Sequence, residues 1–186
     1  MKTKTRDAYA ALHGGFRWHV PRDVNWFELC CSRWARQTPH AVAVIAESAQ
    51  GVVVQHRYAE LHDAALRCAA GLAARGVARG DRVAIVMPQR FETAVAHMAV
   101  SALGAAAMPL SMLFGPEALQ YRLTDSDAKL AIADESAIEA LLAASPGCPL
   151  LGEIVAVGGA AGRGSVDWDA LLRAPHSAIT PVMTQA

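Results

Sequence analysis

One run of residues, from Asp81 to Asp127, limits the possible folds of this chain more than any other. Its start, Arg82–Met87, is apolar and rich in β-branched residues, which is typical of a buried strand. Residues 91–103 place apolar side chains at helical spacing, and a second apolar run, Ala105–Leu110, follows after a glycine. Pro116 then stands where the first position of another helix is expected. Strand, helix and strand within about 30 residues predict a βαβ unit, and so a parallel sheet with right-handed crossovers.

The loops that follow the two predicted strands are the first places to look for a ligand. In parallel sheets, ligands bind beyond the carboxyl ends of the strands. Proline has no N–H to donate to a sheet, so the first strand ends before Pro88 and its loop is Pro88–Arg90. The loop after the second strand is Ser111–Gly115.

The rest of the chain continues the alternation of helices and strands. The expected elements are a helix at 26–36 capped by Asn25, hairpin strands at 41–46 and 52–55, a helix at 58–75, a strand at 129–133, a helix at 136–144, a strand at 154–157 and a helical turn or two at 166–173. The predicted fold class is α/β, with a mostly parallel sheet flanked by helices. We expect an N-terminal arm (1–24) laid on the body, an α/β subdomain (25–174) and a linker (175–186).

Composition argues against several classes of function. Basic and acidic residues both number 17, so the formal net charge is zero and no nucleic-acid partner is expected. The polar N-terminus lacks the apolar stretch of a secretory signal, and residues 91–113 are too interrupted to suggest a membrane span. The four cysteines have no regular spacing, which favours reduced thiols and a cytoplasmic protein.

Three local motifs have structural explanations that we favour over chemical ones. The run Gly158–Ser165 lacks the Lys-Ser/Thr that a phosphate loop needs after its last glycine, so we expect a mobile surface loop. Asp125 and Asp127 are expected to satisfy turn backbone groups rather than to bind a metal. His97, on an otherwise apolar helix, is expected to be a hydrogen-bonded histidine of the core or of an interface. We assign no catalytic, ATP-binding or metal-binding residue.

Two long segments resemble a known family. Residues 58–89 read YAELHDAALRCAAGLAARGVARGDRVAIVMPQ, and residues 90–134 read RFETAVAHMAVSALGAAAMPLSMLFGPEALQYRLTDSDAKLAIAD. Both are similar to the N-terminal portion of AMP-forming acyl-CoA synthetases, in the adenylate-forming superfamily. The variants MPQRFETAVAHMA and LFGPEAL, with FRWHVP near the start, are most similar to the medium-chain or acetyl-CoA-synthetase-like branch. The likeness covers about residues 8–180.

The resemblance implies a two-step ligase that uses ATP, Mg²⁺, CoA and a carboxylic or fatty acid. The acid attacks the α-phosphate of ATP to give acyl-AMP and pyrophosphate, and the thiol of CoA then displaces AMP. The family's phosphate loop (SGTTGxPKG type), its aromatic–Thr–Glu motif, its ribose-binding aspartate and its C-terminal lysine do not occur in this sequence. We therefore expect the N-terminal third of such an enzyme, or a truncated product, that cannot adenylate alone. The alternative is a stand-alone module that binds CoA or a partner protein.

The resemblance carries over a small set of ligand contacts. It implies that Phe114 and Gly115 border the CoA nucleotide, with Phe114 stacking on adenine and Gly115 allowing close backbone approach. The alternative is that Phe114 is a helix-entry staple and Gly115 an N-cap. Two positions depart from the family: a basic residue is missing near Ile138, and Arg57 replaces a capping threonine, which should cost roughly 1 kcal/mol of helix stability. Alone, the chain is expected to self-associate through an exposed apolar face.

Overall fold

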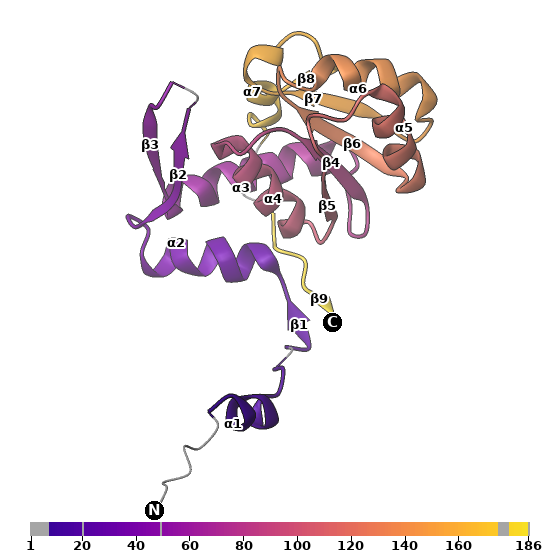
Figure 1. Cartoon of the computed structure of the whole chain (residues 1–186). Helices are drawn as coiled ribbons and strands as arrows, with labels where there is room; N and C mark the ends of the chain where they lie inside the picture. The colour runs from indigo at the N-terminus through magenta and orange to yellow at the C-terminus, as the bar shows by residue number, and fades with distance from the viewer. Residues whose placement is uncertain (1–7, 20, 49, 175–178, 186) are drawn as a thin grey trace, which may run out of the picture.

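The computed structural model describes residues 8–19, 21–48, 50–174 and 179–185. At its centre is a five-stranded sheet in which neighbouring strands are all parallel (Figure 1). Across the sheet the order is β5 (Ala106–Pro109), β4 (Arg82–Val86), β6 (Ala128–Ala133), β7 (Glu153–Ala156) and β8 (Val166–Asp167). With helices on both faces, this arrangement confirms the predicted α/β fold class.

Helices cover each face of the sheet and bury alternate residues of the strands. The helices on one face are α3 (Tyr58–Ala74), α4 (Phe91–Ala102) and α7 (Trp168–Leu171), and those on the other are α5 (Pro116–Asp125) and α6 (Ile138–Ala144). Within β4, Val83 and Ile85 join the first core, whereas Ala84 and Val86 join the second. This is the period of two that a strand imposes on its side chains, and it explains why the central strands are apolar throughout.

Helix α3 approaches α7 so closely that one position tolerates only glycine. A Cβ added to Gly71 would lie 2.4 Å from the backbone oxygen of Leu171 and 2.7 Å from its Cγ. Real Cβ atoms do not approach backbone oxygens that closely, so a side chain at this position would force the two helices apart.

The helix predicted at 26–36 contains a π-helical stretch, η1 (Glu28–Ser32), followed by α2 (Arg33–Gln37). The predicted cap is present, since the backbone N–H of Glu28 donates to Oδ1 of Asn25 at 3.2 Å. The same side chain donates through Nδ2 to the carbonyl oxygens of Ser101 (2.7 Å) and Val182 (2.8 Å). Asn25 is buried and ties the start of this helix to α4 and to the C-terminal segment.

The predicted hairpin is present as β2 (Val42–Glu47) paired antiparallel with β3 (Val53–Arg57). It projects beside the helices and is separate from the central sheet (Figure 1). Half of a capping box follows it: the N–H of Arg57 donates to Oε2 of Glu60 at 3.0 Å, while the guanidinium donates to the oxygen of His40. An arginine side chain has no acceptor, so the reciprocal bond of a complete box cannot form.

The segment just before η1 forms a short antiparallel pairing with the C-terminal segment, which the sequence did not suggest. β1 (Asp23–Val24) pairs with β9 (Thr184–Gln185). The arm also contains α1 (Ala8–Gly15), which lies away from the body in Figure 1. Because Trp18 is 84% exposed, the expectation that the arm is laid on the body is wrong for this residue. The predictions for residues 1–7, 175–178 and 186 fall outside the described residues.

Two 3₁₀ turns complete the fold: η2 (Ser145–Gly147) after α6, and η3 (Gly158–Ala160) after β7. The second lies in the run predicted to be a mobile surface loop; the run is largely exposed, but it begins with a 3₁₀ turn. Its backbone is fixed by hydrogen bonds from Gly159 N–H to Oε2 of Glu135 (3.0 Å) and from Gly162 N–H to Oδ1 of Asp167 (2.6 Å). These bonds convert a glycine-rich sequence into a defined turn, since they satisfy its donors.

Candidate functional site

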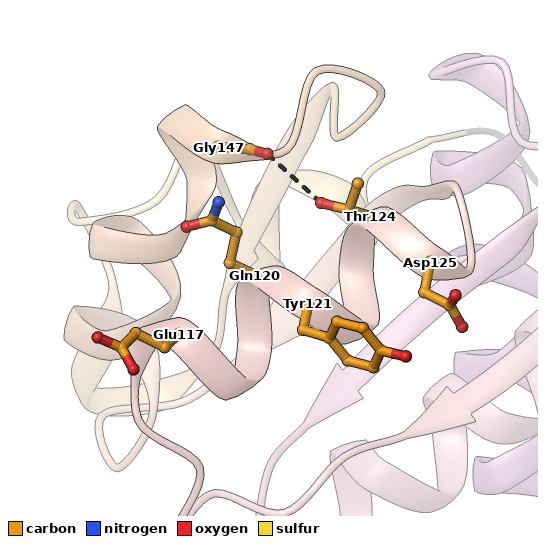
Figure 2. A pocket seen from close by; sticks show the side chains of 6 residues that line it. All are labelled: Glu117, Gln120, Tyr121, Thr124, Asp125 and Gly147. Atoms are coloured by element: carbon orange, nitrogen blue, oxygen red, sulfur yellow. Dashed lines mark hydrogen bonds between the residues drawn. The ribbon is translucent and has the colours of Figure 1, made fainter.

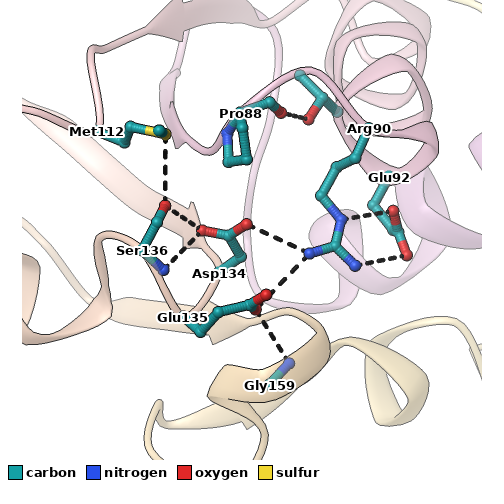
Figure 3. Close-up of polar contacts among 9 residues, drawn as sticks. Pro88, Arg90, Glu92, Met112, Asp134, Glu135, Ser136 and Gly159 are labelled. Atoms are coloured by element: carbon teal, nitrogen blue, oxygen red, sulfur yellow. Dashed lines mark hydrogen bonds and ion pairs between the residues drawn. The ribbon is translucent and has the colours of Figure 1, made fainter. Parts of the chain in front are cut away.

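The carboxyl edge of the sheet is the natural place to look for a site, because the order of the strands reverses there. The chain passes from β4 to β5 on one side and then returns to β6 on the other side of β4. Open α/β sheets bind ligands in the crevice at such a switch point. The loop Pro88–Arg90, predicted from the sequence, lies at this crevice, and the segment Asp134–Ser136 after β6 lies opposite it (Figure 3).

A single arginine bridges the crevice (Figure 3). The guanidinium of Arg90 donates to both carboxylate oxygens of Glu92, at 2.8 and 3.2 Å, and to Oδ2 of Asp134 at 3.2 Å. Oε2 of Glu135 lies 3.7 Å from the same guanidinium. One cation therefore faces three carboxylates, and the crevice carries net negative charge.

The aspartate of this network is buried and held from both sides. Its side chain is only 2% exposed, and Oδ1 of Asp134 accepts hydrogen bonds from the backbone N–H (3.0 Å) and the hydroxyl (2.5 Å) of Ser136. Its backbone oxygen accepts from the N–H groups of Ala137 and Ile138, which start α6. A buried carboxylate is costly unless it is paired and hydrogen-bonded, so Arg90 and Ser136 together satisfy it.

Burial and charge act in opposite directions on Glu92. Partial burial on its own raises the pKa of its carboxyl group, but the hydrogen bonds and the charge of Arg90 outweigh burial and hold the pKa below its ordinary value. Glu92 is therefore ionised at neutral pH and keeps Arg90 fully engaged. An arginine whose donors already contact carboxylates is poorly placed to bind a phosphate.

The glycine-rich run that follows β7 packs against this network. Gly158 has a φ of +58°, and a Cβ placed on it would lie 2.9 Å from Nη2 of Arg90. The backbone of Gly159 donates to Glu135. The glycines thus allow close approach of the backbone to an internal ion pair, which gives this run a structural role.

Two cavities open beside the crevice. The larger, about 660 Å³, lies between the hairpin and the loops after β4 and β6, and it includes Val54, His56 and Phe91. The rings of His56 and Phe91 stack with their centroids 3.7 Å apart. The smaller, about 350 Å³, lies at the carboxyl ends of β4 and β5, and Pro88 and Gln89 line both cavities.

His97 lines the smaller cavity from α4. It is half-buried, and burial lowers the pKa of its imidazole. The prediction of a hydrogen-bonded histidine is wrong within the described part of the chain, where the imidazole has no hydrogen-bond partner. His97 therefore offers a neutral ring to whatever occupies this cavity.

The structure places Phe114 and Gly115 at the end of the loop after β5. Gly115 is the N-cap of α5 with φ −72° and ψ 171°, and a Cβ on it would meet nothing within 4 Å. Phe114 is half-buried and packs against the core beneath α5 and α6. The guanidinium of Arg122 lies over its ring, 4.1 Å from the centroid. Neither predicted residue lines the two cavities at the switch point.

A third hollow, of about 490 Å³, lies on the outer side of α5 (Figure 2). It is lined by Glu117, Gln120, Tyr121, Thr124, Asp125 and Gly147. The amide of Gln120 packs directly on Gly147, where an added Cβ would lie 2.3 Å from it. The hydroxyl of Thr124 also donates to the oxygen of Gly147 at 3.4 Å, so two side chains of α5 contact η2.

Other candidate groups remain separate. Asp127 adopts a φ of +51° in the turn after α5, and its carboxylate lies 3.6 Å from the guanidinium of Arg82. Within residues 8–19, 21–48, 50–174 and 179–185, no group of three or more His, Cys, Asp or Glu residues could hold a metal ion. Over the same residues, none of the helices combines the length and the apolar character that crossing a membrane requires.

Sequence reasoning found the two loops but missed the ion network between them. The acidic pair Asp134–Glu135 stands directly after a buried strand, and Arg90 stands in the loop that follows the neighbouring strand. Carboxyl ends of adjacent parallel strands meet at one edge, so this pattern could have predicted the contact. The signal was overlooked because the two segments are 44 residues apart.

Comparisons with known proteins agree with this architecture. The family model described as "AMP-binding enzyme" matches residues 31–177. Among curated relatives, the acetyl-coenzyme A synthetase of Saccharophagus degradans is 40% identical over 123 residues, covering 61% of this chain and 19% of the relative. That of Escherichia coli (strain K12) is 31% identical over 134 residues, covering 72% of this chain and 21% of the relative.

Solved structures show the same fold. The acetoacetyl-CoA synthetase from Streptomyces lividans superposes with a TM-score of 0.81 at 20% identity, over 91% of this chain and 28% of that one. An acyl-CoA synthetase from Brucella canis gives 0.80 at 23% identity, over 95% of this chain and 34% of that one. The chain spans about a fifth of the length of the curated relatives quoted above. Since the family match extends over most of its residues, the chain belongs to the AMP-binding enzyme family, as its resemblance to acyl-CoA synthetases predicted.

Proposed function

We propose that this chain is the N-terminal part of a cytoplasmic AMP-forming acyl-CoA synthetase and that it supplies one wall of the site for the CoA nucleotide. The complete reaction would join a carboxylic acid to ATP, releasing pyrophosphate, and then transfer the acyl group to the thiol of CoA with release of AMP. ATP with Mg²⁺, and CoA, are the partners that such a reaction requires. The chain's own share is a rigid sheet and an exposed loop.

The observation that carries this proposal is the position of the loop Ser111–Gly115. It leaves the carboxyl end of the edge strand β5 and enters α5, with Gly115 open to solvent and the ring of Phe114 half-buried at the surface. Open backbone beside an aromatic ring suits a purine, which stacks on the ring and approaches the backbone closely. The switch-point crevice suits a phosphate less well, because its arginine already faces three carboxylates.

We further propose that the chain does not adenylate an acid by itself. Transfer of a phosphoryl group needs donors and cations aimed at the developing charge. Arg90 is engaged by carboxylates, and the sequence has no glycine-rich loop followed by Lys-Ser/Thr. No metal-assisted step is assigned to the described residues, since they hold no fitting cluster of ligands.

Calorimetry on the 186-residue chain tests both parts of the proposal. CoA should bind, and Phe114→Ala should weaken its binding by roughly tenfold, the worth of about 1 to 3 kcal/mol of base stacking. Phe16→Ala, which truncates an exposed ring on the N-terminal arm, is the matched control and should change nothing. ATP–pyrophosphate exchange should be undetectable. Exchange above background, or CoA binding that Phe114→Ala leaves unchanged, would contradict the proposal.

A further inference from the structure

The N-terminal arm presents two aromatic rings to solvent. It lies away from the body in Figure 1, and both Phe16 and Trp18 are exposed. Their rings contact each other edge to face, with the centroids 5.0 Å apart. The N–H of Phe16 donates to the oxygen of Leu12 at 2.9 Å, which ties this pair of rings to α1. Exposed rings held together on a projecting segment are well suited to contact another surface, since aromatic residues dominate the energetics of interfaces.

The arm is also basic, whereas the rest of the chain is acidic. Residues 1–24 contain five lysines or arginines and two aspartates, which leaves twelve basic and fifteen acidic residues in the rest of the chain. Between the two rings, Nη1 of Arg17 donates to the backbone oxygens of Gly14 (3.2 Å) and Phe16 (2.8 Å). Among the described residues, no carboxylate pairs with this guanidinium. The arm therefore complements an acidic surface, and the zero net charge of the whole chain conceals this asymmetry.

The cavity between the hairpin and the loops after β4 and β6 has the complementary character. Its volume of about 660 Å³ is large enough for an indole ring. Part of its wall is apolar and comes from Val52, Val54 and the ring of Phe91. Both valines are exposed on the hairpin, so the body of the chain leaves apolar surface uncovered there.

Four carboxylates line the same cavity, and they outnumber its one guanidinium. Three of them belong to the network around Arg90 described above. The fourth is that of Glu47, the last residue of β2, which is exposed at the tip of the hairpin. Within the described part of the chain, no cation pairs with Glu47. The cavity thus joins an apolar wall to an acidic edge, the reverse of the basic and aromatic arm.

We propose that two copies of the chain exchange arms. Trp18 of each copy enters the cavity of the other, and Arg17 pairs there with Glu47. A two-fold dimer of this kind makes the contact twice, because every copy offers one arm and one cavity. The indole packs on Val54 and Phe91, and its N–H has carboxylate acceptors within the same cavity. The rings already contact each other in the free arm, so less conformational freedom is lost on binding. This inference is independent of whether CoA binds.

Sedimentation equilibrium at low salt, over a range of protein concentrations, tests the exchange. The wild-type chain should form dimers, and Trp18→Ala should raise the dimer Kd by roughly tenfold or more, as the loss of a central interface tryptophan does. Arg17→Glu and Glu47→Arg should each weaken the dimer. Both changes in one chain should restore it, because the ion pair is then reversed in both contacts.

Trp26→Ala is the matched control for the aromatic contact. Its ring is 65% exposed but lies outside the arm, so its removal should leave the dimer Kd unchanged. Arg33→Glu, at an exposed position of α2, is the control for the reversal of charge and should also leave it unchanged. Far-UV circular dichroism confirms that each variant is folded.

Four results would overturn the exchange of arms. One is association that Trp18→Ala leaves unchanged, which would then involve another surface, such as the exposed Ile45 and Val53 that do not line the cavity. A second is a monomer at all concentrations, whether or not the arm folds into the cavity of its own copy. A third is a charge-reversed double variant that dimerises no better than the single variants. The last is a chain that is monomeric alone and binds anionic lipid vesicles through Trp18, which would assign the arm to a lipid surface.

Discussion

Removing the cation that bridges the switch point should destabilise the whole subdomain. Arg90→Met keeps the stem of the side chain but leaves Glu92, Asp134 and Glu135 without their shared partner. We expect about 1 kcal/mol for the partly exposed Glu92 and about 2 kcal/mol for the buried Asp134. Glu135 is 55% exposed and should add almost nothing. The sum is about 3 kcal/mol, below the range for a fully uncompensated buried charge because Ser136 still donates two hydrogen bonds to Asp134.

Urea unfolding followed by tryptophan fluorescence measures this loss, with the buried Trp168 as the reporter. Glu135→Gln is the control, since it removes one exposed carboxylate and should change stability by less than about 1 kcal/mol. Adding Asp134→Asn to Arg90→Met should restore part of the loss, because the unpaired buried carboxylate is then gone. A single variant within 1 kcal/mol of wild type, or a double variant that is simply additive, would refute the assigned role of the bridge.

The pH dependence gives an independent check on the same contact. The pKa of Glu92 is held below its ordinary value of 4.5 in the folded chain. A lowered carboxyl pKa adds stability above about pH 4.5, and that stability disappears as the pH falls through the folded pKa. Without Arg90 this pKa should rise, so the gap in stability between wild type and Arg90→Met should narrow between pH 7 and pH 4. A gap that stays constant over that range would count against the pairing.

Three further results are expected. Only Cys30 is exposed among the four cysteines, so a thiol reagent should label one thiol in the native chain and four in denaturant, and Cys30→Ser should abolish native labelling. Gly71→Ala should lower the free energy of unfolding by about 2 kcal/mol or more, although alanine has the better helix propensity. Ala74→Gly, at an exposed site of the same helix, should lower it by no more than about 1 kcal/mol. Light scattering should detect self-association through the hairpin, where Ile45 is 65% and Val53 is 54% exposed. Replacing both residues with lysine should reduce the self-association. A stable monomer at all concentrations would contradict this expectation.

The regular elements could be predicted because their signal is local. Strand β4 and helix α4 end within a residue of the predicted limits. The spacing of their apolar residues, and the proline and glycine that follow them, can all be identified from neighbouring residues in the sequence. The strand pair β1–β9 was missed for the opposite reason. Its two-residue partners lie about 160 positions apart, and neither Asp23–Val24 nor Thr184–Gln185 has a pattern of its own.

The candidate site was predicted as two loops, but its chemistry depends on contacts between distant segments. Whether Arg90 is free for a phosphate depends on Asp134 and Glu135, which a reading of its own loop does not include. The glycine run after β7 likewise gains its meaning from Arg90, over which Gly158 closes. Residue types set the possible partners, and only the strand order decides which of them meet.

The two loops at the carboxyl edge of the sheet therefore differ in the sign of their local charge. At the switch point, one guanidinium faces three carboxylates, so an anionic ligand would meet net repulsion there. At the loop after β5, the guanidinium of Arg122 lies over the ring of Phe114 and has no carboxylate partner among the described residues, so the same ligand would be attracted. A polyanion such as CoA approaching the carboxyl edge would be directed away from β4 and β6 and toward α5. If CoA binds as proposed, raising the salt concentration should weaken its binding to the wild-type chain, and an affinity that does not change with salt would contradict this division of charge.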